Sequence, residues 1–227
     1  MKVLLSWSSG KDSAWTLHVL RRAPGVEVAG LLTTVNEAFG RVAMHAVRVE
    51  LLEAQAAAAG APLWKVPIPD ACTNTQYEAA MSVVLERARG EGIEAVAFGD
   101  LFLEDVRAYR VERMRGTGIE PLFPIWGTPT ARLARDMVAA GLQARLTCVD
   151  PRALDRSFAG RAFDGRLLDD LPAGVDPCGE RGEFHTFAWA GPMFARPVPV
   201  RVGEIVERGG FVFADLLPDQ VEPSRRG

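Results

Sequence analysis

The first half of this chain alternates strand-like and helix-like segments, and that alternation limits the fold more than any other feature. Apolar runs predict strands at residues 2–6, 26–34, 63–68, 95–98 and 122–125. Helical patterns fall between them, at residues 12–22, 45–59, 75–89 and 104–115. Strands that alternate with helices in this way pair in parallel, with right-handed crossovers. We therefore expect βαβ units on one parallel sheet, which binds ligands at the carboxyl ends of its strands.

Local signals predict where two helices begin. Thr75 and Glu78 have the spacing of a capping box, which would open the helix that runs to about residue 89. Thr128 and Pro129 resemble an N-cap residue followed by a proline at the first helical position. That second signal predicts a further helix, which ends near residue 141.

The pattern changes after about residue 127. Strand-like runs recur at 144–149, 184–189 and 198–206, and a stretch rich in Gly, Pro and Asp separates the first of them from the others. We interpret this half as a smaller α+β unit packed against the first. The expected domains are therefore residues 1–126 and residues 127–227.

Composition excludes several classes of protein. The formal net charge is −3, so the chain lacks the basic excess of a general nucleic-acid binder. Its three cysteines form no CxxC pair, which argues against a zinc ribbon or a disulfide framework and favours a reducing, cytoplasmic compartment. The N-terminal apolar run is too short for a signal peptide, and no stretch approaches the length of a membrane span.

The candidate chemistry lies in residues 8–13, between the first predicted strand and the first helix. A helix N-terminus offers free amides and partial positive charge, and small residues let the backbone close around phosphate oxygens. The spacing is not that of a Walker A loop, because the lysine is followed by Asp12. An aspartate beside a triphosphate suggests a Mg²⁺ ion held between them. The simpler interpretation is a capped strand-to-helix turn without a ligand.

This loop is similar to a known signature. It resembles the SGGxDS sequence of the PP-loop ATP pyrophosphatases, with Ser9 in place of the first glycine. Residues 7–13 more narrowly resemble the WSGGKDS start of the diphthine–ammonia ligase family. Further stretches are similar to that family in the same order, at residues 44–45, 105–112, 123–127, 179–187 and 192–194. The resemblance covers nearly the whole chain, and residues 179–187 resemble the long GEGGE(F/Y)xT signature.

The resemblance implies a fold and a reaction. The fold would be that of the adenine nucleotide alpha hydrolases, a five-stranded parallel sheet with helices on both faces, followed by a C-terminal domain that helps form the substrate site. The reaction would be an amidation in which ATP adenylylates a carboxylate, pyrophosphate leaves, and ammonia displaces AMP. In the founding members that carboxylate is diphthine, a modified histidine on elongation factor two. His185 and residues 104–109 depart from the family pattern, so the acceptor of this chain is left open.

The family resemblance and the positions of the strand ends together predict which residues are catalytic, which bind ATP and which bind the acceptor. Lys11, Asp12, Glu183 and His185 are the expected catalytic residues, and Asp12 is the expected Mg²⁺ ligand. The residues expected to bind ATP are Ser6, Trp7, Ser8, Ser9, Gly10, Lys11, Asp12, Ser13, Thr33, Thr34, Gly99 and Asp100. Those expected to bind the acceptor are His45, Arg110, Gly179, Glu180, Gly182, Glu183 and Thr186.

Two other functions fit parts of the sequence. Some PP-loop enzymes insert sulfur into tRNA, but they need reactive cysteines, and the absence of a CxxC pair counts against that activity. A nucleotide-binding sensor without enzymatic activity would lack both the Asp12-Ser13 pair and the C-terminal signature. No glutaminase domain is recognisable, so free ammonium is the expected nitrogen source. The oligomeric state is open, with a homodimer as one option.

Overall fold

A parallel sheet forms the N-terminal half of the protein, which we describe from a computed structural model at residues 1–36, 41–42 and 47–219. Its parallel strands are β1 (Lys2–Ser6), β2 (Glu27–Asn36), β4 (Leu63–Ile68), β5 (Ala95–Ala97) and β6 (Glu120–Leu122). They lie in the order β4-β2-β1-β5-β6. The predicted five-stranded parallel sheet is therefore confirmed. The short strand β3 (Arg41–Val42), which pairs antiparallel with the end of β2, was not predicted because two residues show no periodicity.

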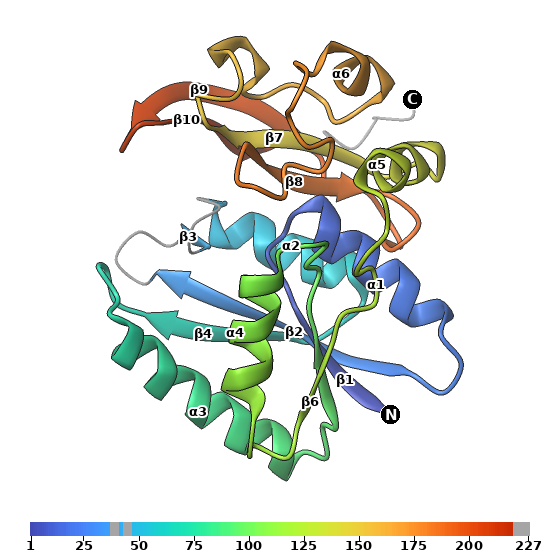
Figure 1. The fold of residues 1–227 in the computed structure, drawn as a ribbon, viewed down its shortest axis with the longest axis vertical. Coiled ribbons are helices and arrows are strands. Elements are labelled where there is room, and N and C mark those ends of the chain that lie inside the picture. Colours follow the sequence, from blue (N-terminus) through green and yellow to red (C-terminus); the bar gives the residue numbers. More distant parts are fainter. Residues whose placement is uncertain (37–40, 43–46, 220–227) are drawn as a thin grey trace, which may run out of the picture.

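Helices cover both faces of this sheet (Figure 1). Helices α1 (Lys11–Arg22) and α2 (Val49–Ala59) lie between the parallel sheet and the C-terminal half, and α3 (Asn74–Gly90) and α4 (Glu104–Met114) cover the opposite face. The alternation of side chains along β1 explains the two cores. Val3 and Leu5 belong to the large cluster with α1 and α2, whereas Leu4 belongs to the smaller cluster that holds Met114 of α4.

The C-terminal half is built on an antiparallel sheet. Its strands are β7 (Gln143–Val149), β8 (Phe184–Ala190), β9 (Val200–Arg208) and β10 (Phe211–Pro218), in the order β8-β7-β10-β9. Helices α5 (Thr130–Ala139) and α6 (Gly165–Asp170) and a short 3₁₀ turn, η1 (Arg156–Phe158), complete it. The prediction omitted β10, although Gly209 and Gly210 between β9 and β10 are a hairpin signal.

Several predicted boundaries were wrong by a few residues. The capping box is formed by Thr73 and Gln76 rather than by Thr75 and Glu78, because the helix begins earlier than predicted. Thr73 Oγ1 accepts from Gln76 N at 3.3 Å, and Gln76 Oε1 accepts from Thr73 N at 2.9 Å. Pro129 is itself the N-cap of α5, so the predicted cap at Thr128 was also wrong.

Two further boundaries differ from the prediction. The last strand of the parallel sheet is Glu120–Leu122 instead of 122–125, since its register is set by pairing with β5. The second helix begins at Val49 rather than at residue 45. None of the helices in the described ranges is long and apolar enough to cross a bilayer.

Candidate functional site

The 8–13 loop, which includes the first residues of α1, connects β1 to that helix, and its own hydroxyl groups hold its shape. Ser8 Oγ lies 3.2 Å from Ser13 Oγ and accepts a hydrogen bond from Gly10 N at 3.3 Å. Ser13 Oγ donates to Gly10 O at 3.0 Å. The loop therefore turns tightly just before α1, whose N-terminal end carries the partial positive charge that attracts anions.

Ser9 has the most unusual backbone in the loop. Its φ of 68° lies in the left-handed region, it is completely buried, and its Oγ has no hydrogen-bond partner among the described residues. A left-handed conformation costs a residue with a β-carbon about 1–2 kcal/mol, which explains why glycine stands here in the signature that the loop resembles. Strain combined with an unpaired buried hydroxyl is typical of functional sites.

The C-terminal half closes directly onto the 8–13 loop. Thr186 Oγ1 on β8 accepts from Lys11 N at 3.0 Å, and Ala188 N donates to Ser9 O at 2.9 Å. A β-carbon added to Gly10 would stand 3.2 Å from Thr186 O, so the loop and the strand are in close contact. The loop and Thr186, which the sequence assigned to ATP and to the acceptor, are therefore brought together.

Gln55 on α2 is a site residue that sequence reasoning missed. It is fully buried, and its Oε1 accepts from Trp7 Nε1 at 2.9 Å. Its Nε2 donates to Ser9 O at 2.9 Å and also to Ala188 O. One amide thus joins α2, the loop and β8. The signal in the sequence is a lone amide within an alanine-rich helix, because a buried polar group needs partners.

Lys11 points into the protein rather than into solvent. Its side chain is 2% exposed, and Nζ donates to Asp12 Oδ2 at 2.8 Å and to Cys178 O. It also lies 5.3 Å and 5.5 Å from the ring centroids of Phe184 and Phe163. Burial alone would lower the pKa of Lys11, but the neighbouring carboxylate charges raise it, so the ammonium is retained. The contact between Lys11 and ATP phosphates stays a prediction.

Asp12 has one carboxylate oxygen in use and one unused. Oδ2 accepts from Lys11, whereas Oδ1 is buried without a hydrogen-bond partner in the described part of the chain. Burial raises the pKa of Asp12, the charge of Lys11 opposes that rise, and the charge of Asp176 adds to it. The unused oxygen is available to a cation.

Residues 176–183 form a second loop, and Glu183 organises it. Glu183 is 7% exposed; its Oε1 accepts from Asp176 N at 2.9 Å, and its Oε2 accepts from Arg181 N at 3.0 Å. Both oxygens therefore bind backbone amides of the 176–183 loop. These two hydrogen bonds give the carboxylate of Glu183 a structural role in the loop. The catalytic role expected of Glu183 stays a prediction.

Glu180 reaches from the 176–183 loop to the parallel sheet. Its Oε1 accepts from Leu101 N at 2.8 Å, just beyond β5. Burial raises the pKa of Glu180 to about 7; the bond from Leu101 N opposes the rise, and the charges of Asp12 and Asp100 add to it. A carboxylate with such a pKa exchanges protons readily near neutral pH.

The two glycines of the 176–183 loop allow it to turn into β8. Gly179 has a φ of 68°, and a β-carbon there would lie 2.8 Å from Phe184 O, so only glycine fits. Gly182 has a φ of 87°.

Burial and the charge of Lys11 lower the pKa of His185, which follows on β8. Its imidazole is therefore neutral at neutral pH and able to accept a proton.

A β-bulge lies opposite this segment of β8. Leu146 pairs with Thr186, and Cys148 pairs with His185, which leaves Thr147 as the extra residue. Bulges of this kind redirect side chains and are common beside active sites. The sequence of β7 carries no signal for the bulge, because it depends on the register with β8.

Gly99 and Asp100 lie just beyond β5, which ends at Ala97, and they make different contacts. A β-carbon on Gly99 would lie 3.2 Å from Asp12 C, so the absence of a side chain lets this strand end approach α1. Asp100 binds Arg110, with 3.1 Å between Oδ1 and Nη2. Arg110 also lies 4.4 Å from the ring centroid of Phe98. Asp100 and Arg110, which the sequence assigned to separate ligands, therefore pair with each other.

The predicted adenine-binding residues Ser6 and Trp7 lie at the end of β1, whereas Thr33 and Thr34 lie within β2, which runs on to Asn36 instead of ending at Thr34. Thr33 Oγ1 donates to Trp7 O at 2.7 Å, which ties β2 to the residue after β1. Ser6 and Thr34 are partly buried at the same edge. His45, expected to bind the acceptor, lies outside the described residues.

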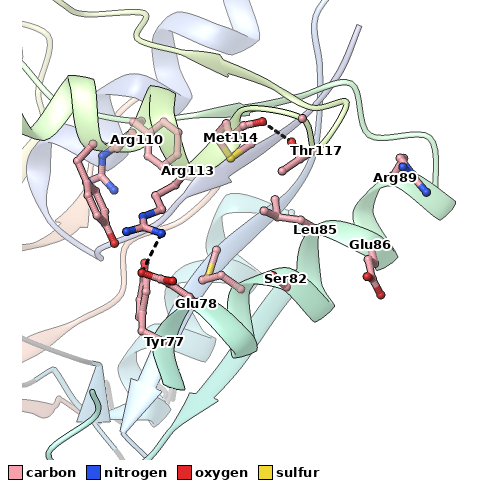
Figure 2. A pocket seen from close by; sticks show the side chains of 14 residues that line it. Tyr77, Glu78, Ser82, Leu85, Glu86, Arg89, Arg110, Arg113, Met114 and Thr117 are labelled. Atoms are coloured by element: carbon pink, nitrogen blue, oxygen red, sulfur yellow. Dashed lines mark hydrogen bonds and ion pairs between the residues drawn. The ribbon is translucent and has the colours of Figure 1, made fainter. Parts of the chain in front are cut away.

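A hollow of about 370 Å³ lies between α3 and α4, away from the loops (Figure 2). Tyr77, Glu78, Arg110 and Arg113 are among its lining residues, and Arg113 Nη1 lies 2.9 Å from Glu78 Oε1. Arg110 thus links this hollow to Asp100. Nothing in the 8–13 loop or the 176–183 loop lines the hollow, so it is not the candidate site.

Two family models match the chain in sequence. The diphthamide synthase N-terminal domain matches residues 1–120, and the diphthamide synthase C-terminal domain matches residues 129–213. The two matches cover both loops and the strands that carry them.

Curated relatives agree with these models. The chain is 26% identical over 172 residues to a diphthine–ammonia ligase of Bos taurus, covering 69% of this chain and 64% of that protein. It is 30% identical over 142 residues to one of Homo sapiens, covering 60% and 52%. For one of Schizosaccharomyces pombe the identity is 31% over 120 residues, covering 51% and 20%. The chain thus spans only part of the length of the relatives that it matches. On the family models, it belongs to the diphthamide synthase family.

Proposed function

We propose that this protein is an ATP-dependent ligase that adenylylates a carboxylate, releases pyrophosphate and forms an amide with ammonia. The observation that carries the proposal is the junction of the two loops. The 8–13 loop stands at the N-terminus of α1 and contacts β8 through Thr186, and its Ser9 Oγ and Asp12 Oδ1 are buried with no hydrogen-bond partner in the part of the chain that the structure describes. Unsatisfied buried polar atoms at a helix N-terminus favour a ligand that supplies both anionic oxygens and a cation.

The nucleotide would bind along the edge of the parallel sheet. The 8–13 loop and Ser9 Oγ would hold the phosphates, with Lys11 nearby. Adenine would lie at the ends of β1 and β2, near Ser6, Trp7 and Thr33, where backbone groups can read its edge. Gly99 supports this placement, because its missing side chain brings the end of β5 against α1.

The residues at the loop suit a Mg²⁺ ion. Mg²⁺ in nucleotide sites uses one or two carboxylates together with phosphate oxygens. Asp12 Oδ1 is a buried oxygen without a partner among the described residues, so it fits this role. When bound, the ion would neutralise charge on the phosphates. Lys11 keeps Oδ2 of Asp12 engaged, and so orients Oδ1.

The acceptor would bind between the two loops. Residues 179–186 provide a second wall facing the 8–13 loop, and such a wall positions the carboxylate for in-line attack and keeps water from the acyl-adenylate. His185 is neutral at neutral pH, because burial and the charge of Lys11 lower its pKa, and it would take up a proton released during amide formation. Glu183 would act by keeping the 176–183 loop in place.

The two buried cysteines, Cys148 and Cys178, are poorly suited to sulfur transfer. Burial raises the pKa of the Cys148 thiol to about 12, and it also raises that of Cys178. A thiol must ionise to act as a nucleophile. We therefore prefer the ligase to a sulfur-transferring enzyme, and we propose that it acts in the cytoplasm. We further propose that residues 1–126 form the ATP-binding domain and residues 127–227 the acceptor domain.

The test is transfer of labelled nitrogen. The protein is incubated with ATP, Mg²⁺, ¹⁵N-ammonium chloride and elongation factor two that carries diphthine, and the acceptor is analysed by mass spectrometry. We expect one ¹⁵N in the modified histidine for each AMP released. Release of AMP without nitrogen transfer would point to a different carboxylate. Failure to release any AMP with this acceptor, or with a set of other protein and small-molecule carboxylates, would refute the proposal.

A further inference from the structure

Asp176, at the start of the 176–183 loop, has a carboxylate oxygen that the described residues leave unsatisfied. Asp176 is 4% exposed, and its Oδ1 accepts from Cys178 N at 3.0 Å. Its Oδ2 is buried and has no hydrogen-bond partner among the described residues. A buried carboxylate is costly unless it is paired. This atom therefore needs a positively charged or hydrogen-bond-donating ligand.

The surroundings of Asp176 carry more negative than positive charge. The charges of Asp12, Asp176 and Glu180 all act on the Cys178 thiol at the centre of this region. Lys11 is the cation that faces them, and its Nζ is already bonded to Asp12 and to Cys178 O. The nearby Arg181 lies 3.9 Å from Glu183 and 5.4 Å from the ring centroid of Phe102. Two of the three carboxylates thus lack an ion-pair partner in the described part of the chain.

We propose that Asp176 and Glu180, beside Asp12 and Lys11, form the binding site for the ammonium ion that supplies the amide nitrogen. The proposal rests on the ligase function proposed above. It adds Asp176, which neither the motifs nor the family resemblance singled out. Glu180 contributes because its Oε1 is fixed by Leu101 N, which sets the carboxylate between the 176–183 loop and the end of β5.

The arrangement suits ammonium better than a divalent metal. No group of three or more His, Cys, Asp or Glu within the described ranges is arranged to hold a metal ion, which argues against a metal held here by protein side chains alone. Mg²⁺ demands near-ideal octahedral geometry at short distances. Ammonium instead donates hydrogen bonds to separate acceptors, and charge-assisted bonds to carboxylates are the strong kind.

The site also accounts for the protons of the reaction. Ammonium must lose a proton before its nitrogen has a lone pair, and the carboxylate of Glu180 would accept it. Ammonia then attacks the acyl carbon, the bond between that carbon and the AMP oxygen breaks, and the electron pair leaves with AMP. The nitrogen loses its second proton to the neutral imidazole of His185. The pKa of Glu180, raised to about 7 chiefly by burial, suits this exchange.

The first test needs neither turnover nor a variant. Thallium(I) has the same single positive charge as ammonium and nearly the same radius, and it scatters anomalously. Crystals of the wild-type protein are soaked in thallium acetate, and we expect an anomalous peak within hydrogen-bond distance of Asp176 Oδ2. An excess of ammonium chloride should displace it, and the same excess of sodium chloride should not. An absent peak, or one confined to other carboxylates, would overturn the proposal.

The second test measures the ammonium dependence of amide formation. Asp176→Asn keeps the shape and the acceptor for Cys178 N but removes the charge. We expect the ammonium concentration for half-maximal rate to rise on the order of tenfold or more, because a charge-assisted bond is lost. The KM for ATP should stay unchanged. Asp136→Asn, at an exposed position on α5, is the matched control and should behave as the wild type does.

The two proposals fail separately. Thallium bound at Asp176 in a protein that makes no AMP would leave the cation site standing and refute the ligase. Amide formation with an unchanged ammonium dependence in Asp176→Asn, and with no thallium peak, would keep the ligase and refute the ammonium site.

Discussion

Ser9 is a single residue that makes the 8–13 loop differ from the same loop with a glycine at this position. A glycine would adopt the φ of 68° without strain, and it would carry no hydroxyl to bury. The chain keeps a serine whose Oγ has no partner among the described residues. We therefore expect stability and nucleotide binding to respond to this residue in opposite directions.

Ser9→Gly should raise the free energy of unfolding by roughly 0.5–1 kcal/mol, because it removes the left-handed strain and the unpaired hydroxyl. It should also weaken ATP binding, since the hydroxyl would no longer reach a phosphate. Urea denaturation and calorimetric titration measure the two effects. Ser9→Ala is the control, because it loses the hydroxyl but keeps the strain. A Ser9→Gly protein less stable than the wild type would contradict this account.

Glu180 should make stability depend on pH. Its folded pKa of about 7 lies above the ordinary 4.5, so the folded protein binds the proton more tightly than the unfolded chain does. Stability is therefore lost as pH rises from 4.5 towards 7. Glu180→Gln cannot ionise and keeps an acceptor for Leu101 N.

The difference between Glu180→Gln and wild type should therefore grow with pH. We expect the variant to gain roughly 1–3 kcal/mol of unfolding free energy over the wild type between pH 5 and pH 8, towards the lower end because Glu180 is partly exposed. Urea unfolding at several pH values measures this, with Glu204→Gln on exposed β9 as the control. Parallel curves for Glu180→Gln and wild type would show that Glu180 ionises normally in the folded protein.

At the scale of the element, the sequence contains two possible capping boxes for α3, Thr73 with Gln76 and Thr75 with Glu78. The structure has the first of them. Thr73→Ala should lower the free energy of unfolding by about 1 kcal/mol, because it removes the side-chain acceptor for Gln76 N. Thr75→Ala, within the first turn, should change it by less than about 0.5 kcal/mol. Thermal unfolding of both variants decides between the boxes, and a larger loss for Thr75→Ala would contradict the observed start of α3.

Elements with a long, clear pattern were predictable, and those set by pairing were not. The strands β1 and β4 were predicted with the bounds observed, because short apolar runs ended by polar loops or Gly and Pro mark buried strands. The two-residue strand β3 and the bulge at Thr147 depend on neighbouring strands, and no local signal marks them. The shift from Thr75 to Thr73 arose because the T-x-x-E/Q spacing occurs twice within six residues.

At the scale of the whole molecule, the candidate site is a junction between halves that are far apart in sequence. The 8–13 loop was predictable from its composition and place, but its partners were not. Lys11 N meets Thr186 Oγ1 across 175 positions, and Gln55 meets Ala188 across 133. Residue types predict that Lys11 binds a phosphate, which stays a prediction, but they carry no signal for the contact of Lys11 Nζ with Cys178 O. Long-range contacts decide such orientations.

The most direct test of the central claim is the product of ATP turnover. The protein is incubated with ATP, Mg²⁺, ammonium and the acceptor, and the nucleotides and phosphates are resolved by ³¹P NMR. We expect AMP and pyrophosphate in equal amounts, with a rate that falls on the order of 100-fold in Asp12→Asn and is unchanged in Asp136→Asn. ADP and phosphate as products, or an Asp12→Asn protein with the wild-type rate, would contradict it.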